Sequence, residues 1–415
     1  MTRFIRNQIN DTPIVDTVFA IVKKADAAKT KYGADKVVDA TIGALYNEEG
    51  KIVAYNSVFE HYNTIANSAK AKYAASFTGN ADYRKRVYEW LVQDNTLKLN
   101  HSVIATPGGS GAVSMSMVDT LDANETIILP EIAWGSYKLM ASMNNINTVT
   151  YQLFDGDKFN IADFEKVCSE VMNKQGKVMV VINDPCHNPT GYSLSNEEWQ
   201  QIVNVLNNLS KSGPVILLND IAYIDYAYDF IASRKYLNNF NNISDQVMVI
   251  VAFSCSKTLT SYGLRCGAAV ILAQQAEDAR QMEIVMEKSA RATWSNIPNA
   301  AMDNFVYVTT KGYEDYNLEK ARYVALLKQR SDIFVSQADE VGLKHYPYKE
   351  GFFVTIKMPD NATRDAYHEA LMANNIFTVC VNKGIRVAIC SLSVDKCLGL
   401  AAKMKTILDE TLNQQ

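Results

Sequence analysis

Short apolar runs rich in β-branched residues alternate with helical patterns through the middle of the chain. Four of these runs lie at residues 102–106, 126–129, 178–182 and 215–218, and each has the length of a buried strand. A capping box at residues 195–198 begins one of the helical stretches between them. Strands that alternate with helices of this length predict an α/β fold with a mostly parallel sheet flanked by helices. In such sheets, ligands bind beyond the carboxyl ends of the strands.

The pattern of predicted helices and strands changes beyond about residue 312. A long polar helical pattern, roughly 316–338, is followed by shorter strand-like runs at 352–356 and 385–389. With 415 residues, 48% of them hydrophobic, the chain can form one large core and a second, smaller one. The predicted division is a large domain at 49–312 and a small, discontinuous α/β domain at 1–48 and 313–415.

Charge and cysteine content argue against several classes of protein. The net charge is −4 and there is no long basic run, which argues against a nucleic-acid partner. The start of the chain is too polar for a secretory signal, and no apolar run approaches the roughly 20 residues that span a bilayer. Seven scattered cysteines form neither a Cys-x-x-Cys pair nor a Cys/His metal pattern. We therefore expect a soluble cytoplasmic protein with free thiols, no membrane partner and no metal site.

Lys257 is the first candidate for chemistry. It ends the apolar run at 247–257, which is typical of a buried strand, and Arg265 follows eight residues later. An amine at the mouth of a strand can be desolvated and kept partly neutral, as a Schiff-base lysine must be. A nearby arginine can bind a phosphate. Together they suggest a lysine that binds pyridoxal phosphate, although an isolated Ser-x-x-Lys is more often a solvated lysine in a loop.

Three further patterns follow predicted strands. The glycine-rich stretch at 106–111 could bind a phosphate at a helix N-terminus, or it could be an ordinary turn. The stretch at 186–191 is typical of a loop, and we interpret His187 as structural because no second metal ligand stands at a suitable spacing. Asp220 ends another apolar strand, where a buried carboxylate needs a cationic partner or a hydrogen bond, and a protonated pyridine nitrogen would supply one. Tyr223 could donate a hydrogen bond to the phenolate oxygen of the same ring.

The order and spacing of these motifs are more informative than any one of them. In chain order they are Thr-Pro-Gly-Gly-Ser-Gly-Ala at 106–112, Cys-His-Asn-Pro-Thr-Gly at 186–191, Asp-x-Ala-Tyr at 220–223, Ser-x-Ser-Lys at 254–257, Arg265, Arg-x-x-Trp-Ser-Asn at 291–296 and Arg386. From about Thr12 to Arg386 the chain resembles the fold type I enzymes that depend on pyridoxal phosphate, specifically the aspartate/aromatic aminotransferases of class I/II. The resemblance implies the PLP-dependent transferase fold type I, with pyridoxal phosphate (PLP) as the cofactor.

The resemblance also implies roles for individual residues. Lys257 binds the cofactor covalently and moves the proton at the substrate Cα. Asp220 keeps the pyridine nitrogen protonated, which makes the ring an electron sink. Asn188 and Tyr223 hydrogen-bond the phenolic oxygen of the ring, and Trp134 stacks on the ring. The residues expected to be catalytic are Lys257, Asp220 and Tyr223.

The implied phosphate site combines residues of two subunits. The matching residues of the same subunit are Gly109, Ser110, Ser254 and Arg265. Tyr73 and Ser295 match residues that reach the phosphate from a neighbouring subunit. The resemblance therefore implies a homodimer with shared active sites.

The implied substrate site centres on two arginines. Arg386 matches the arginine that binds the substrate α-carboxylate, a bidentate task that suits the planar guanidinium. Gly43, Trp134 and Asn188 match other substrate-site positions. Arg291 matches an arginine that crosses the dimer and pairs with the distal carboxylate of aspartate or glutamate.

Several positions depart from the usual aspartate pattern. Thr41 stands where glycine is common, and Asn183 with Asp184 stands where His-Gly is typical. Leu264 replaces an acidic residue before the phosphate arginine, and the stretch 295–298 lacks the first proline of a Pro-Pro pair. The implied cofactor chemistry is unaffected by these changes, but the side-chain specificity stays open.

The leading hypothesis is an aminotransferase that exchanges an amino group between an amino acid and a 2-oxo acid. Arg291 favours aspartate or glutamate, and an aromatic amino acid aminotransferase is the alternative. A PLP-dependent lyase or aspartate β-decarboxylase is a second class, although such decarboxylases usually have extra segments. A non-catalytic regulator would need an N-terminal DNA-binding domain, which we do not expect because residues 12–15 match the start of the aminotransferase arm.

Overall fold

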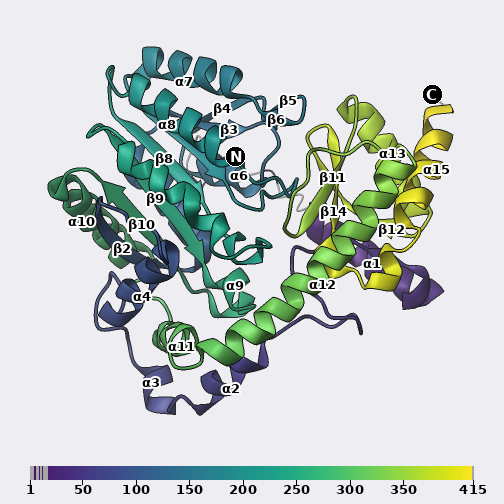
Figure 1. Ribbon diagram of the computed structural model, residues 1–415, viewed down its shortest axis with the longest axis horizontal. Helices are drawn as coiled ribbons and strands as arrows, with labels where there is room; N and C mark the ends of the chain where they lie inside the picture. Colours follow the sequence, from purple (N-terminus) through teal and green to yellow (C-terminus); the bar gives the residue numbers. More distant parts are fainter. Residues whose placement is uncertain (1–3, 6–8, 10–11, 13–16, 414–415) are drawn as a thin grey trace.

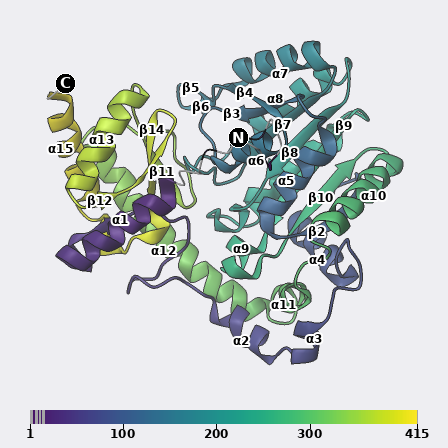
Figure 2. The ribbon, with the colours of Figure 1, turned by 180° about the vertical axis from the view of Figure 1, so that it is seen from behind.

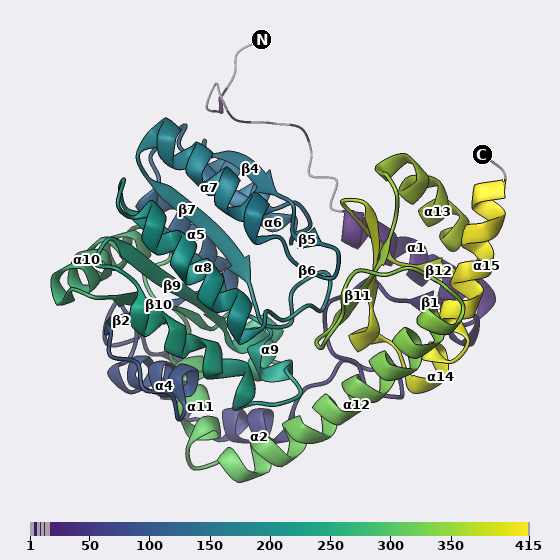
Figure 3. The same cartoon turned by 45° about the horizontal axis from the view of Figure 1, so that its top comes forward.

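The computed structural model describes residues 4–5, 9, 12 and 17–413. Residues 13–16, in the stretch matched to the aminotransferase arm, lie outside the described residues. Figure 3 shows a larger and a smaller α/β part, with the long helix α12 (Tyr313–Glu340) running between them. The domain boundaries given above stay a prediction.

A seven-stranded sheet forms the centre of the larger part (Figure 1). Its strands, in spatial order, are β2 (Asn100–Thr106), β10 (Gly267–Ala273), β9 (Val247–Ser254), β8 (Val215–Asp220), β7 (Val178–Asn183), β3 (Thr126–Pro130) and β4 (Asn147–Tyr151). Only β10 runs against its neighbours, β2 and β9, whereas the pairs from β9 to β4 are parallel. The predicted mostly parallel sheet, with its four strand runs, is confirmed.

Helices cover both faces of this sheet because its central strands are apolar on both faces (Figure 2). One face packs with α5 (Gly108–Thr120), α6 (Ser136–Met143) and α10 (Ala276–Thr293). The other packs with α4 (Ala81–Val92), α7 (Ile161–Gln175), α8 (Asn196–Leu209) and α11 (Asn299–Thr309). The predicted capping box is present at the start of α8, where Ser195 and Glu198 each accept a hydrogen bond from the other's backbone N–H.

The smaller part is built on a three-stranded antiparallel sheet. Its strands, in spatial order, are β11 (Phe353–Lys357), β14 (Gly384–Ala388) and β13 (Val379–Val381). β1 (Val38–Asp39) pairs in parallel with β12 (Ile376–Phe377), so the N-terminal region lies beside the C-terminal region. The helices of this part are α1 (Thr17–Tyr32), α13 (Asn361–Ala373), α14 (Val394–Cys397) and α15 (Leu400–Asn413).

Short elements complete the fold. They are α2 (Asn56–Thr64), α3 (Asn67–Ala71), α9 (Cys255–Thr258), β5 (Phe154–Asp155), β6 (Lys158–Phe159), and the 3₁₀ helices Ala34–Lys36, Ile224–Tyr226, Ala232–Asn242, Tyr262–Leu264 and Ile389–Ser391. The prediction that Lys257 ends a strand is wrong, because β9 ends at Ser254 and the chain then turns into α9, with Leu259 N–H bonded to Cys255 O. The helix α5 begins at Gly108, directly after Pro107, which cannot continue the strand ladder and suits a helix start.

Candidate active site

The carboxyl ends of three parallel strands meet at one edge of the large sheet. β7 ends at Asn183, β8 at Asp220 and β9 at Ser254, and Asn183 is paired with Asp220 in the sheet register. The segments that follow these ends contain Asn188, Tyr223, Lys257 and Arg265, four of the residues singled out from the sequence. This edge is therefore the candidate site.

Lys257 lies on α9, just beyond the end of β9, and its side chain is half-buried. Its amine donates a hydrogen bond to the backbone oxygen of Gly43 at 2.5 Å. Burial lowers the pKa of the Lys257 amine to about 8, and the nearby charges of Arg386 and Arg265 act in the same direction while Cys390 opposes them. A substantial fraction of the amine is therefore neutral at mildly alkaline pH, as a nucleophilic lysine requires.

Asp220 is a buried carboxylate that no cation in the described part of the chain contacts. Its Oδ2 accepts a hydrogen bond from Tyr137 Oη at 2.6 Å, and its Oδ1 accepts one from the Ala222 N–H at 3.0 Å. Burial raises the pKa of Asp220, while these two hydrogen bonds lower it. A cationic ligand nitrogen at this point would stabilise the ionised carboxylate. The protonated ring of pyridoxal phosphate fits this requirement.

Tyr137 is a site residue that the sequence reasoning missed. It is fully buried on α6, and its ring packs edge to face with that of Trp134, with the centroids 5.4 Å apart. Asp220, Tyr137 and Trp134 are thus in contact in that order. Trp134 is half-buried, so it is the member of the three nearest the surface. The available signal was position, because Tyr137 stands in the first turn of a helix that follows the carboxyl end of β3.

The start of α5 lies close to the end of β9 and to Arg265. A Cβ on Gly108 would come within 2.6 Å of Arg265 Nη2, and one on Gly109 within 3.1 Å of Ser254 Cβ. These glycines therefore allow the loop to approach both residues closely. The side chain of Arg265 is exposed, with Nη1 bonded to Ser256 Oγ at 3.1 Å. Free N–H groups at the start of a helix, with Ser110 in its first turn, suit an anion.

Arg386 reaches the same region from β14 of the smaller sheet. Its Nη2 donates to Thr41 O at 2.6 Å and its Nη1 makes a long contact of 3.4 Å with Asn188 Oδ1. Its Nε is buried without a hydrogen-bond partner in the described part of the chain. Gly43 lies close by, since a Cβ there would be 3.7 Å from Tyr223 Oη. The structure thus brings together four of the predicted residues, and Arg386 retains capacity for a further acceptor.

The pair at 183–184, which departs from the family pattern, supports the loop behind the site. Asn183 Nδ2 donates to Asp220 O at 2.8 Å, and Asn183 Oδ1 accepts from the Asn188 N–H at 2.7 Å. Asp184 accepts from the Leu194 N–H at 2.7 Å, and burial raises the pKa of its carboxyl to about 7. These residues therefore hold the loop of Asn188 against the end of β8.

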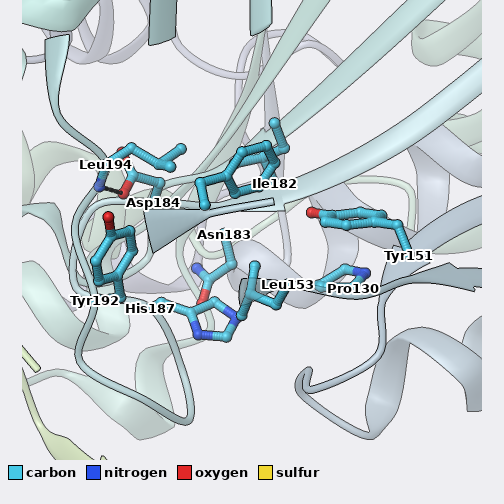
Figure 4. Close-up of a pocket in the computed structure, with 10 residues that line it drawn as sticks. Pro130, Tyr151, Leu153, Ile182, Asn183, Asp184, His187, Tyr192 and Leu194 are labelled. Carbon is cyan, nitrogen blue, oxygen red and sulfur yellow. Dashed lines mark hydrogen bonds between the residues drawn. The ribbon is translucent and has the colours of Figure 1, made fainter. Parts of the chain in front are cut away.

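A small cavity of about 10 Å³ lies beside Asn183 and Asp184, with room for about one water (Figure 4). His187 is among the residues that line it. Its Nδ1 lies 2.8 Å from Thr190 Oγ1, and its Nε2 has no hydrogen-bond partner in the described part of the chain. Burial lowers the pKa of His187 to about 3, so this histidine is neutral. This geometry agrees with its interpretation as a structural residue.

Tyr73, Arg291 and Ser295 lie together in a different place. They line an open pocket of about 600 Å³ together with Phe77 and Glu287. Arg291 Nη1 donates to Ser295 Oγ at 2.7 Å, and its guanidinium lies 4.8 Å from the centroid of the Phe77 ring. Tyr73 is 79% exposed. The lining of this pocket does not include Lys257, Asp220 or Arg386, so within one chain these three residues lie apart from the site at Lys257.

All seven cysteines are free thiols. No helix in the described ranges is long and apolar enough to cross a bilayer. Among the same residues, no three His, Cys, Asp or Glu side chains are grouped as metal ligands would be.

The family model of the class I and II aminotransferases matches residues 35–403. This chain belongs to that family. A solved structure of an aminotransferase from Anaerococcus prevotii is 33% identical and superimposes with a TM-score of 0.93, covering 98% of this chain and 99% of that one. The aminotransferase family thus accounts for the fold and for the order of the site motifs.

More distant relatives have names that specify substrates. The aspartate aminotransferase of Salmonella typhi is 26% identical over 63% of this chain and 65% of that protein. The aromatic-amino-acid aminotransferase of Paracoccus denitrificans is 23% identical over the same shares. The chain thus spans just under two thirds of these relatives. A structure of the aromatic-amino-acid aminotransferase of Burkholderia pseudomallei, covalently bound to pyridoxal phosphate, shares the fold with a TM-score of 0.79 and 20% identity, covering 98% of this chain and 100% of that one.

Proposed function

We propose that this protein is an aminotransferase that uses pyridoxal phosphate to move an amino group from an amino acid to a 2-oxo acid. One observation carries the proposal: Asp220, a buried carboxylate that no cation in the described ranges contacts, ends β8, and Lys257, a half-buried lysine with a lowered pKa, lies on α9 just beyond the end of the adjacent strand β9. Membership of the class I and II aminotransferases and the names of the relatives support it.

The residues present fit this cofactor. Asp220 would bind the protonated ring nitrogen, and Arg265 with the N-terminal N–H groups of α5 would bind the phosphate. Asn188 and Tyr223 would donate hydrogen bonds to the phenolic oxygen of the ring, and Trp134 would pack against the ring. When bound, pyridoxal phosphate supplies an electron sink for the negative charge that develops at the substrate Cα.

Lys257 performs the proton chemistry in this proposal. Its lowered pKa leaves part of the amine neutral, so Nζ can accept the proton from the substrate Cα and return it during the transfer. Arg386 binds the substrate α-carboxylate and orients the Cα–H bond toward Lys257. Because Arg386 is buried, water competes little for its guanidinium, and the carboxylate contact is correspondingly stronger.

Dicarboxylic amino acids are the proposed substrates, and a homodimer is the proposed active form. In one chain Arg291 lies in a pocket apart from Lys257, so Arg291 would act in the site of a second copy. There its guanidinium would pair with the distal carboxylate of aspartate or glutamate, while Tyr73 and Ser295 would approach the phosphate of that site. The open, 600 Å³ pocket around these three residues is the surface that a second copy would cover.

An aromatic amino acid is the second candidate substrate. Tyr223 lies against Phe352 and Phe353, with ring centroids 5.2 Å and 5.6 Å apart, so the wall of the site near Arg386 is aromatic. The guanidinium of Arg291 also packs over the ring of Phe77. Because the Arg291 guanidinium can pack against an aromatic ring, it could leave the substrate pocket at a low free-energy cost. Its departure would make room for the phenyl ring of an aromatic substrate.

A spectroscopic half-reaction tests the proposal. The protein loaded with pyridoxal phosphate is mixed separately with L-aspartate, L-glutamate, L-phenylalanine and L-tyrosine, without an oxo acid. Conversion of the cofactor absorbance to that of pyridoxamine phosphate by the dicarboxylates alone supports an aspartate-type enzyme, and conversion by all four supports the broader specificity. If none of the four converts it, the proposed substrates are wrong, and release of CO₂ or ammonia would indicate a lyase instead.

We also infer a cytoplasmic location. The seven free cysteines, six of them with hardly any accessible surface, support a reducing compartment. Oxidising compartments would favour disulfide pairing of so many thiols. Fractionation of the source cells, followed by detection of the protein in the soluble fraction, tests this inference.

A further inference from the structure

The turn that contains Lys257 is held in place by polar side chains from other parts of the fold. Tyr226 Oη donates to Lys257 O at 3.0 Å, and Tyr316 Oη, on α12, donates to Thr258 O at 2.8 Å. The hydroxyl of Thr258 donates to Asp225 Oδ2 at 2.5 Å. Since α9 has only four residues, it contributes few hydrogen bonds of its own, and these external contacts define its position.

Asp225 is the charged member of this set. Its Oδ1 accepts from Arg234 Nη2 at 2.6 Å, and its Oδ2 accepts from Trp90 Nε1 at 3.1 Å as well as from Thr258. The Asp225 and Arg234 side chains are 1% and 0% exposed. Burial acts to raise the pKa of Asp225, but Arg234, Lys320 and the hydrogen bonds outweigh it, and the pKa is lowered. The carboxylate is thus ionised, dry and fixed at both oxygens.

We propose that Asp225 is a positioning residue for Lys257, acting through its hydrogen bond with Thr258. The carboxylate fixes the side chain of Thr258, and so fixes the backbone of the residue next to Lys257. The Lys257 side chain then leaves α9 in the direction that brings Nζ to Gly43 O. The importance of this position for catalysis rests on the proposed function, but the effect on the amine does not.

The hydrogen bond from Thr258 to Asp225 contributes more free energy at this buried position than it would at the surface. It joins a hydroxyl to a buried carboxylate, and hydrogen bonds to charged groups are shorter and stronger than neutral ones. Removing the hydroxyl leaves Asp225 with Arg234 and Trp90, so no charge is left unpaired. The fold should therefore survive the loss, whereas the fixed position of α9 should not.

The test measures the pKa of Lys257 in the protein without cofactor. Competitive labelling with acetic anhydride over a pH series, quantified by mass spectrometry of the peptide containing Lys257, gives the pH midpoint of the amine. We expect a midpoint near 8 in the unchanged protein. In Thr258→Val the amine becomes more exposed, and we expect the midpoint to rise by about one unit toward the ordinary lysine value.

Three variants complete the experiment. Thr258→Ser keeps the hydroxyl and should retain the original midpoint. Thr411→Val, in α15, removes a similar buried hydroxyl that bonds Ile407 O at 2.7 Å, and should not change it. Thr258→Ala removes the same hydroxyl without the bulk of valine and replaces Thr258→Val if that variant does not fold. Circular dichroism and thermal melting establish that each labelled variant is folded.

The groups facing the amine are the same in all these variants, namely Arg386, Arg265, Cys390, Tyr223 and Tyr262. A shifted midpoint therefore reports a displacement of Lys257. An unchanged midpoint in folded variants without the hydroxyl overturns the positioning role. A shift in the variants, together with release of CO₂ or ammonia and no half-reaction in the unchanged protein, would mean that the positioning stands and the proposed aminotransferase function is wrong.

Discussion

Lys257 Nζ donates a hydrogen bond to the backbone oxygen of Gly43, although the two residues are 214 positions apart in the chain. The acceptor is a neutral carbonyl, so the ammonium gains no ion pair that would raise its pKa. Burial and two neighbouring arginines instead lower the pKa to about 8. The contact also joins the N-terminal segment to the end of β9, so the amine lies at the junction of the two parts of the molecule.

Lys257→Ala should abolish transamination and leave the fold intact. Alanine removes both the covalent attachment and the proton acceptor, and proton transfer by a positioned group contributes about 10²- to 10⁴-fold on its own. Single-turnover kinetics with aspartate measure the loss, and circular dichroism checks the fold. Lys138→Ala, at an exposed position on α6, is the matched control and should react normally. Turnover by Lys257→Ala without an added amine would refute the mechanism.

Arg291→Ala should impair aspartate far more than phenylalanine. A substrate carboxylate left unpaired in a partly buried site costs on the order of a few kcal/mol, which corresponds to roughly a 100-fold loss in kcat/KM. The ratio of kcat/KM for the two substrates is the measurement. Arg322→Ala, an exposed arginine on α12, should leave that ratio unchanged. Equal losses for both substrates would contradict the assigned role of Arg291.

Tyr137→Phe should weaken cofactor binding. It removes one of the two hydrogen bonds that lower the pKa of Asp220, so the carboxyl is protonated more readily and attracts the ring nitrogen less. Hydrogen bonds to charged groups contribute about 1.5–3 kcal/mol, and we expect the Kd for pyridoxal phosphate to rise about 10- to 100-fold. Equilibrium dialysis gives this constant.

Tyr151→Phe is the control for that measurement. Tyr151 is equally buried, but its hydroxyl has only a long contact of 3.5 Å with Val181 O. Its loss should leave the Kd for pyridoxal phosphate close to that of the unchanged protein. The same Kd in Tyr137→Phe as in the unchanged protein would mean that Tyr137 does not support Asp220.

Lys320→Met should stabilise the protein at neutral pH. The Lys320 amine is buried without a hydrogen-bond partner in the described part of the chain, 3.9 Å from the Phe230 ring centroid. Burial lowers its pKa from 10.5 to about 8, with Arg234 acting in the same direction and Asp225 against it. Replacing a buried charge with an apolar group of similar volume is often neutral or stabilising by about 1–4 kcal/mol.

The stabilisation by Lys320→Met should depend on pH. Between pH 8 and 10.5 the unfolded chain binds a proton at Lys320 that the folded chain does not, so the stability of the unchanged protein rises through this window. The advantage of Lys320→Met, measured by urea unfolding, should therefore be largest at pH 7 and smaller at pH 10. Lys328→Met, at an exposed position on the same helix, should show no such trend. An advantage that is constant with pH would contradict the lowered pKa.

Local patterns in the sequence were sufficient for the sheet and for the loops at its edge. The glycines at 108–109 and Asp220 each stand next to a strand that its β-branched residues predict, and the order of the strands brings their ends together, whereas β10, which follows Arg265, was not predicted. The position of Lys257 was predicted less well. It lies on α9 beyond the strand, because polar residues after Ser254 allow the chain to turn.

The roles of Tyr137 and Asp225 could not be assigned in this way. The position of Tyr137 after β3 indicates only that it lies near the sheet edge, and each role follows from a hydrogen-bond partner, Asp220 for Tyr137 and Thr258 for Asp225. These partners are 83 and 33 residues away in the chain. No local pattern of hydrophobicity or turn residues indicates such a pair.

The sequence by itself determined the alternation of strands and helices and the order of the site motifs, because those depend on periodicity and on the residues that start and end elements. The tertiary structure alone decided which side chains are shielded from water and which charged groups have a counter-ion nearby. The lowered pKa of Lys257 and the raised pKa of the Asp220 carboxyl result from burial by segments distant in the chain, and burial depends on the packing of the whole molecule.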